Sequence, residues 1–141
     1  MDIQKQIQDL NERLKHRERV EYTQTSAPAN YTPTEAGWAG GATFDCNYVK
    51  VGKLVHLWYQ ITGTSDGAAH TITLPSAGTV AHDTTSSYFF HRGLEGAVWF
   101  TGMSSIGDGV TVITFYKDAA ATAYAATGVL NIYGYVCYWE A

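Results

Sequence analysis

Five histidines are the residues of this chain best suited to metal binding or acid–base chemistry: His16, His56, His70, His82 and His91. A zinc site built on one element needs pairs spaced as HxH, HxxxH or HExxH, because both ligands must reach one ion from the same face. None of the histidines has such a partner in the sequence. The sequence therefore predicts neither a metal site nor a cofactor.

Four carboxylates fall in or near expected loops, where a pair could serve glycoside hydrolysis: Asp66, Asp83, Glu95 and Asp108. Asp66 and Asp108 each precede a turn glycine, which is a common setting for an aspartate that stabilises a turn. No serine stands in a nucleophile elbow, and no glycine-rich phosphate loop links a predicted strand to a helix. We therefore predict no enzyme; a glycan-cleaving depolymerase would require the loop carboxylates to converge.

Aromatic residues in or beside predicted strands offer binding chemistry instead. Exposed rings stack against sugar faces and anchor protein interfaces, whereas buried rings would only fill the core. The candidate surface-ligand contacts are Tyr88, Phe90, Trp58 and Trp99. Tyr88, Phe89 and Phe90 are consecutive, so they alternate between the two faces of a strand and at least one of them leaves the core.

Charge is unevenly distributed along the chain. Residues 1–21 carry five acids and five bases, whereas the remaining 120 residues carry eight acids and four bases. A weakly charged domain suits a protein that packs against its own copies or against a partner. The formal net charge of −4 gives no reason to expect nucleic acid or an anionic membrane as a partner.

The N-terminal 20 residues are highly charged and contain no continuous apolar stretch, so we expect no secretory signal and synthesis in a cytoplasm. No run of apolar residues is long enough to span a bilayer. The two cysteines, Cys46 and Cys137, are too few for a zinc site or a disulfide framework. We expect them to be buried thiols on neighbouring strands.

The periodicity predicts a helix over residues 2–19, within an N-terminal segment 1–21 that would serve oligomerisation or anchor the chain to a larger particle. The apolar residues Ile3, Ile7, Leu10 and Leu14 are spaced four, three and four apart, which is the a/d seam of a coiled coil. A helix this short is only marginally stable in isolation, so we expect association with other chains to stabilise it. The seam itself leaves dimer and trimer open.

Residues 22–42, which contain Pro28 and Pro33, are predicted to form an extended connector, and residues 43–141 a head domain. In the head the period becomes two. The predicted strands are Thr43–Val51, Lys53–Thr62, His70–Leu74, Tyr88–His91, Ala97–Gly102, Val110–Tyr116 and Val129–Trp139. Seven short strands without a second helix predict an all-β domain, an antiparallel sandwich or jelly-roll.

The last predicted strand has no polar face. Its apolar residues alternate with Tyr133, Tyr135, Cys137 and Trp139, so both faces are hydrophobic or aromatic. Burial on both faces is expected when one side packs in the core and the other side packs against another subunit. The candidate oligomerisation residues are therefore Ile3, Ile7, Leu10, Leu14, Tyr133, Tyr135 and Trp139.

Several segments resemble a β module found at the tip of phage tail fibres and in related virion proteins. The run Tyr48-Val-Lys-Val-Gly-Lys-Leu-Val55 fits the pattern Y-x-x-x-G-x-x-V, and Ile72-Thr-Leu-Pro75 ends a strand with "LP". Trp38 follows Thr34-Glu35-Ala36-Gly37 as at the start of the module, and Leu130–Trp139 resembles its closing strand. The resemblance covers about residues 34–139. It implies a trimer with a jelly-roll-like or sandwich head on the surface of a virion.

Two functions fit this resemblance. The first is a trimeric attachment protein that is fixed to a tail or capsid and binds a host-surface glycan or protein through its head. The second is a capsid decoration (cement) or head-fibre protein that binds the major capsid protein. Tail fibres usually carry a sizeable N-terminal domain, whereas about 20 residues of helix and a connector precede this head, which favours the second function.

Overall fold

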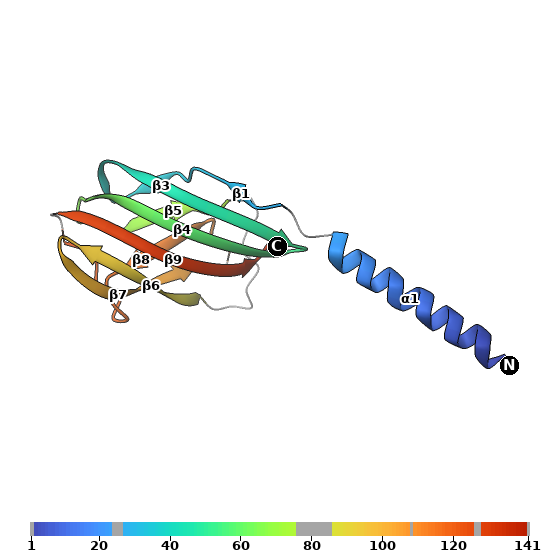
Figure 1. The fold of residues 1–141 in the computed structure, drawn as a ribbon. Helices are drawn as coiled ribbons and strands as arrows, with labels where there is room; N and C mark the ends of the chain where they lie inside the picture. Colours follow the sequence, from blue (N-terminus) through green and yellow to red (C-terminus); the bar gives the residue numbers. More distant parts are fainter. Residues whose placement is uncertain (1, 24–26, 76–85, 108, 126–127, 141) are drawn as a thin grey trace.

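The described part of the chain forms one helix followed by an antiparallel β domain (Figure 1). The structure is a computed structural model that describes residues 2–23, 27–75, 86–107, 109–125 and 128–140, with residues 14–23 described by their backbone alone. The expected all-β domain with a short N-terminal helix is confirmed.

The helix, α1, spans Ile3–Thr23. Asp2 caps its N-terminus, because its carboxylate accepts a hydrogen bond of 3.0 Å from the backbone N–H of Gln4. Figure 1 shows α1 standing apart from the sheet. No helix in the described part of the chain is long and apolar enough to cross a membrane.

Nine strands form one sheet in the order β1-β3-β4-β9-β6-β7-β8-β5-β2. Their bounds are β1 (Ala29–Asn30), β2 (Glu35–Ala36), β3 (Trp38–Val51), β4 (Leu54–Ser65), β5 (His70–Thr73), β6 (Ser87–Glu95), β7 (Val98–Ile106), β8 (Val112–Tyr116) and β9 (Val129–Trp139). Strands β3 to β9 correspond to the seven predicted segments. The sheet is curled, with β5 and β8 passing behind β4 and β9 in Figure 1.

Two hairpins in this sheet, β3–β4 and β6–β7, have loops of two residues. The first loop residue is glycine in both, with φ of 60° at Gly52 and 61° at Gly96. A type II′ turn requires positive φ at this position, and its twist matches that of the flanking strands. These glycines therefore fix the register of the long strands.

The core fills the inside of the curl. Strands β4 and β9 contribute side chains that are fully buried, because alternate residues of a strand point to the same face: Val55, Leu57, Ile61, Leu130, Ile132 and Val136. Ile72, Ile113 and Phe115 come from β5 and β8 on the opposite side of the curl. The predicted alternation along β4 and β9 is confirmed by this burial.

The range 22–42 does not form the expected extended connector throughout. Strand β1 pairs with β3, strand β2 pairs with β5, and Trp38 at the start of β3 is buried. The Ser, Thr and Gly content suggested no packed element. Each short strand is instead held by a partner distant in sequence, as where Glu35 lies opposite Ile72.

The segment between β1 and β2 closes the curl. The hydroxyl of Tyr31 donates to the backbone oxygen of Thr73 at 3.1 Å, and the N–H of Thr73 donates to the backbone oxygen of Thr34 at 2.9 Å. Tyr31 also donates its backbone N–H to Cys46 in β3. The segment thus links β3 to β5, two strands on opposite sides of the sheet order.

The two cysteines lie on opposite faces of the sheet and are both free thiols. Cys46 in β3 faces the core, and burial raises its pKa to about 12. Cys137 in β9 lies on the outer face and is half-buried. Strand β4 separates β3 from β9, so the expectation of buried thiols on neighbouring strands is wrong.

Candidate functional site

The strands β4, β9, β6 and β7 lie side by side and present one broad outer surface (Figure 1). Pairing fixes which side chains share it: Trp58 lies opposite Tyr135, and Arg92 lies opposite Tyr133. We call this surface the outer aromatic face and define it by His56, Trp58, Gln60, Tyr88, Phe90, Arg92, Trp99, Thr101, Asn131, Tyr133, Tyr135, Cys137 and Trp139.

Three rings form a cluster in the part of this face that we call its proximal half. The ring centroids of Trp58 and Tyr135 are 5.4 Å apart, and the His56 ring stacks on both at about 6 Å. His56 Nδ1 lies 2.6 Å from the Tyr135 hydroxyl, which ties the two side chains together. Trp58 stays 47% exposed. The cluster is therefore ordered by its own contacts while its surface is open.

A second cluster occupies the distal half. The guanidinium carbon of Arg92 lies 3.7 Å from the centroid of the Trp99 ring, and the Trp99 and Tyr133 rings are 6.1 Å apart. Beside them lies a shallow depression whose lining includes Phe90, Arg92, Trp99 and Thr101. Phe90 is 74% exposed, so it stands out from the sheet.

The two halves lie at different levels of the strands. The chain arriving from α1 joins the sheet where Ala29 pairs with Tyr48, near the end of the face that carries Trp139. Trp99 lies opposite Leu94, which lies opposite Asn131. At about 3.3 Å per residue, Asn131 is roughly 26 Å from Trp139 along β9. Ala29 is level with Val136 in β9, so Tyr135 in the proximal half lies next to the junction with α1. The distal half, at the level of Tyr133 and Asn131, lies roughly 10–17 Å farther along the strand.

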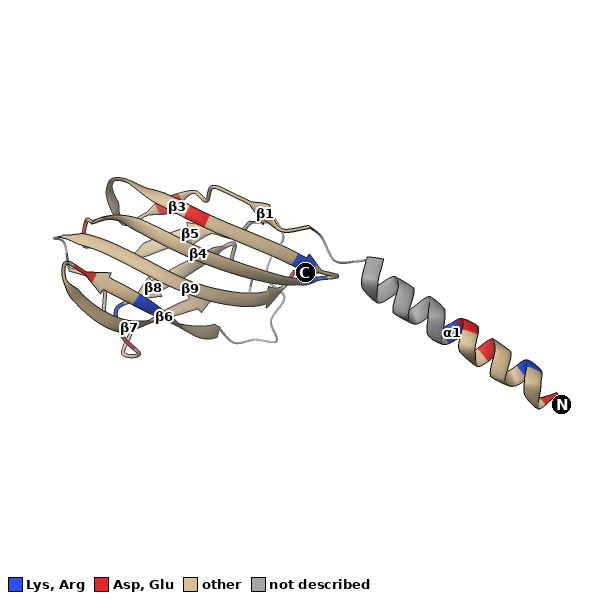
Figure 2. Cartoon of the chain, in the orientation of Figure 1, with Lys and Arg blue, Asp and Glu red and all other residues tan. Residues whose placement is uncertain are grey.

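Arg92 is the only charged residue at the outward-facing positions of β4, β9, β6 and β7 in the described ranges. Figure 2 shows these strands almost entirely in tan, apart from one blue segment within β6 and the red end of that strand. No carboxylate within the described residues forms an ion pair with Arg92. The carboxylate at the end of β6, Glu95, is paired with Lys117 at 2.5 Å. The guanidinium therefore lacks a counter-charge within the residues that the structure describes.

Strand pairing brings together two residue sets that the sequence suggested for separate roles. The candidate ligand contacts Tyr88, Phe90, Trp58 and Trp99 and the candidate oligomerisation residues Tyr133, Tyr135 and Trp139 all lie on the outer aromatic face. Tyr88, Phe90, Trp58, Trp99 and Trp139 are exposed in the single chain. Whether this face binds a ligand, another subunit or both remains a prediction.

The remaining candidate oligomerisation residues lie on α1. Ile3, Ile7 and Leu10 are 70%, 54% and 57% exposed, so the apolar seam is uncovered in the single chain. The side chain of Leu14 lies outside the described residues. Exposure of three large aliphatic side chains along one stripe is costly in water, so the seam is available for association.

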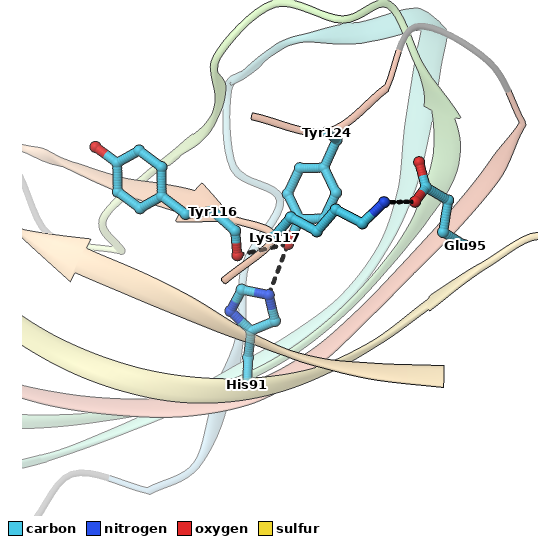
Figure 3. A network of polar contacts seen from close by, with 5 residues as sticks. All are labelled: His91, Glu95, Tyr116, Lys117 and Tyr124. Atoms are coloured by element: carbon cyan, nitrogen blue, oxygen red, sulfur yellow. Dashed lines mark hydrogen bonds and ion pairs between the residues drawn. The ribbon is translucent and has the colours of Figure 1, made fainter. Parts of the chain in front are cut away.

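Inside the curl, His91 is the centre of a buried polar network. The Tyr124 hydroxyl donates to the backbone oxygen of Tyr116 at 3.1 Å and therefore accepts the Nε2–H of His91 at 2.7 Å (Figure 3). On the other side, His91 Nδ1 accepts the Ser104 hydroxyl at 2.8 Å. Ser104 in turn accepts the Tyr59 hydroxyl at 2.7 Å. One assignment of the protons satisfies every member of this chain.

This network holds His91 in its neutral form. Burial lowers the pKa of His91 to about 4, and burial raises the pKa of both Tyr59 and Tyr124 above the usual tyrosine range. A charged imidazolium would need Nδ1 to donate, which would reverse the hydroxyl chain through Ser104. The network therefore stabilises the fold around a neutral histidine.

A serine bonded to a histidine resembles a nucleophile and its base. Here Ser104 is fully buried and already accepts a hydrogen bond from Tyr59, so no substrate reaches its oxygen. We assign this pair a structural role. The alternation of Phe89, Phe90 and His91 indicates that His91 points inward, but the sequence gives no signal for its partners Ser104 and Tyr124.

A second buried histidine, His70, packs edge-on against two rings. Its centroid is 4.7 Å from Trp38 and 5.0 Å from Tyr124. Neither ring nitrogen has a hydrogen-bond partner among the described residues. Burial lowers the pKa of His70, so it too is neutral in the core.

The loop carboxylates do not form a catalytic pair among the described residues. The carboxylate of Asp66 accepts the N–H of Ala68 at 2.8 Å within its turn, and Glu95 is paired with Lys117. Asp83 and Asp108 lie outside the described residues, as does His82. No group of three or more His, Cys, Asp or Glu residues in the described ranges is placed to hold a metal ion.

Comparisons with known proteins found no relative of this chain. No protein-family model matches the chain, and no curated protein or solved structure is similar enough to count as a match.

Proposed function

We propose that this chain is a non-enzymatic virion-surface protein of the trimeric fibre or attachment type, which binds a host surface through its β head. The observation that carries the proposal is the outer aromatic face: an ordered, exposed and almost uncharged array of rings on the central strands. Rings of this kind dominate binding energy at protein and ligand interfaces. The resemblance of residues 34–139 to virion β modules supports the biological setting.

The helix α1 assembles the chains in this proposal. Its seam residues Ile3, Ile7 and Leu10 are exposed in the single chain, and a helix of this length is marginal without partners. Identical helices cover such a seam with side chains of the same kind. We take the trimer from the resemblance, because the seam alone is compatible with a coiled coil of two or three helices.

The two halves of the outer aromatic face have different roles in this assembly. Chains joined through α1 converge where they enter the sheet, which is beside the proximal half. This half consists of the aromatic residues His56, Trp58 and Tyr135 and includes no carboxylate or lysine, so it suits contact with another copy. The distal half, with Arg92 and Trp99, lies roughly 10–17 Å from that junction along the strands and remains free for the host.

The head is further proposed to have the jelly-roll-like or sandwich arrangement that the resemblance implies. The curl supports this arrangement, because β5 and β8 lie behind β4 and β9 (Figure 1) and the buried side chains of all four strands belong to one core cluster. An experimental structure of the trimer in which the strands form two packed sheets would bear it out, and a closed barrel would contradict it.

Adsorption of the full chain to intact cells tests the proposal. Fluorescently labelled protein is incubated with a panel of bacterial strains and with an array of bacterial surface glycans. We expect binding to a subset of strains, lost in Trp99→Ala and kept in Val110→Ala, which shortens an exposed apolar residue outside the face. Assembled protein that binds no strain and no glycan contradicts the proposal.

A capsid decoration or head-fibre protein is the second candidate. The observation that favours it is the apolar end of the outer aromatic face, where Trp139 and Val51 are 53% and 41% exposed next to the junction with α1. A capsid protein could cover this end. Detection of the chain in tails purified free of heads rules out the second candidate, and detection on tail-free heads supports it.

A further inference from the structure

We infer that the distal half of the outer aromatic face is a binding site for a saccharide that bears a carboxylate, such as a uronic acid. The inference rests on the proposed function and names the ligand class of that surface. Its core is the pair Arg92 and Trp99, in which a guanidinium with no ion pair in the described part of the chain lies over an aromatic ring.

The geometry of Arg92 leaves its donors free. The guanidinium carbon lies 3.7 Å from the centroid of the Trp99 ring, and none of its N–H groups has a hydrogen-bond or ion-pair partner among the described residues. A carboxylate binds such a group edge-on through two parallel hydrogen bonds. Stacking also removes the conformational freedom that a solvated arginine would lose on binding.

The surroundings of Arg92 fit a sugar ring. Phe90 and Trp99 line the adjoining shallow depression and offer apolar surfaces for the C–H groups of a pyranose. Thr101 and Tyr133 lie directly opposite Arg92 on the two neighbouring strands and offer hydroxyl groups. An acidic sugar has C–H faces, hydroxyl groups and a carboxylate. The aromatic rings, the hydroxyls and the guanidinium of this site match these three kinds of group.

The position of the site disfavours an acidic peptide as its ligand. Extended peptides commonly bind by adding a strand to an exposed sheet edge, where main-chain groups are unpaired. Arg92 lies in β6, whose two neighbours β9 and β7 already pair with it at this level. A peptide here would leave its own main-chain groups without sheet partners, whereas a sugar brings its own hydroxyls.

Titration of the full chain with a panel of uronate oligosaccharides tests the inference. The probes are galacturonate, glucuronate, mannuronate and guluronate oligomers, each paired with its carboxyl-reduced, neutral counterpart. We expect at least one acidic oligomer to bind at least about tenfold more tightly than its neutral counterpart, because a charge-assisted bidentate contact is lost on reduction. We expect Arg92→Gln to abolish this preference and Arg92→Lys to restore part of it.

Lys53→Gln is the matched control, because it removes an exposed cation at the β3–β4 turn, remote from Arg92. It should leave the preference intact, and a loss there would reveal non-specific charge attraction and overturn the site. Equal affinity for acidic and neutral oligomers, or no binding of any acidic oligomer, also overturns it. Tighter binding of poly-glutamate than of every uronate assigns the surface to an acidic peptide instead.

Cell adsorption separates a failure of this inference from a failure of the proposed function. If Trp99→Ala abolishes adsorption while Arg92→Gln adsorbs like the wild type, the face binds its host but the ligand is not acidic. If uronates bind through Arg92 and no cell adsorbs the protein, the saccharide site stands and the attachment role falls.

Discussion

Tyr59 in β4 lies directly opposite Gly134 in β9, and its phenol occupies the space that a side chain at residue 134 would fill. A Cβ on Gly134 would lie 2.2 Å from the Tyr59 oxygen. The pattern continues across the sheet, because Gly134 also lies opposite His91, which lies opposite Gly102. Rings and glycines alternate along this row, so the glycines make room for the polar network inside the curl.

Gly134→Ala should destabilise the head by about 1–3 kcal/mol, because the added methyl group overpacks a buried site. Tyr59 cannot move away without losing its hydrogen bond to Ser104. Urea unfolding followed by tryptophan fluorescence measures the change. Gly107→Ala is the control, since its Cβ would meet its nearest atom at 3.5 Å, and it should be close to neutral. If both variants are as stable as the wild type, the Tyr59 ring has room to shift and the expected overpacking is wrong.

The stability of the head should fall as the pH falls from about 6.5 to about 4. The unfolded chain binds a proton at His91 near its ordinary pKa of about 6.5, whereas burial holds the folded pKa at about 4. Between these values the unfolded state binds more protons, so acid favours unfolding, by about 3 kcal/mol over the window. His70 adds to the loss in the same direction.

Urea unfolding at pH 7.5, 6 and 5 measures this dependence. His91→Gln should make the decline shallower even if the variant is less stable at every pH, because only the contribution of His70 remains. His56→Gln, which changes an imidazole on the outer face, should keep the decline. A free energy of unfolding that stays constant between pH 7.5 and 5 would contradict the neutral buried network.

Replacing Ile7 and Leu10 with Asp should weaken assembly, because two charges would enter the apolar seam of α1. Light scattering should give three times the 15.4 kDa chain mass for the wild type and a lower mass for the variant. The matched control places Asp at Gln8 and Asn11, outside the seam. A variant that stays fully oligomeric would mean that the heads alone hold the assembly.

Period-two alternation was sufficient to predict the long strands, and Val129–Trp139 has the same bounds in the sequence prediction and in the structure. It was not sufficient for β1 and β2, because two-residue strands carry no period and exist only through distant partners such as Ile72. The arrangement of the candidate site could not be predicted for the same reason, because it depends on pairing between distant strands. The register between strands places Trp58 next to Tyr135 and Trp99 next to Arg92, and the sequence does not reveal this register.

We expect the assembled protein to cover the proximal half of the outer aromatic face with its own copies and to leave the distal half open. Cys137 reports on the proximal half, because it lies opposite His56 in β4. Cys46 faces the core, and its pKa of about 12 keeps it unreactive whether or not the chains assemble. One folded chain thus contains both the reporter and its control.

The most direct test is the rate of Cys137 alkylation by iodoacetamide, measured by mass spectrometry on the full chain over a range of protein concentrations. Light scattering on the same samples gives the fraction assembled. The account predicts that Cys137 reacts several-fold more slowly in the assembled state, while Cys46 stays unmodified throughout. An alkylation rate at Cys137 that does not change with assembly would show that the proximal half is open in the oligomer and would contradict the account.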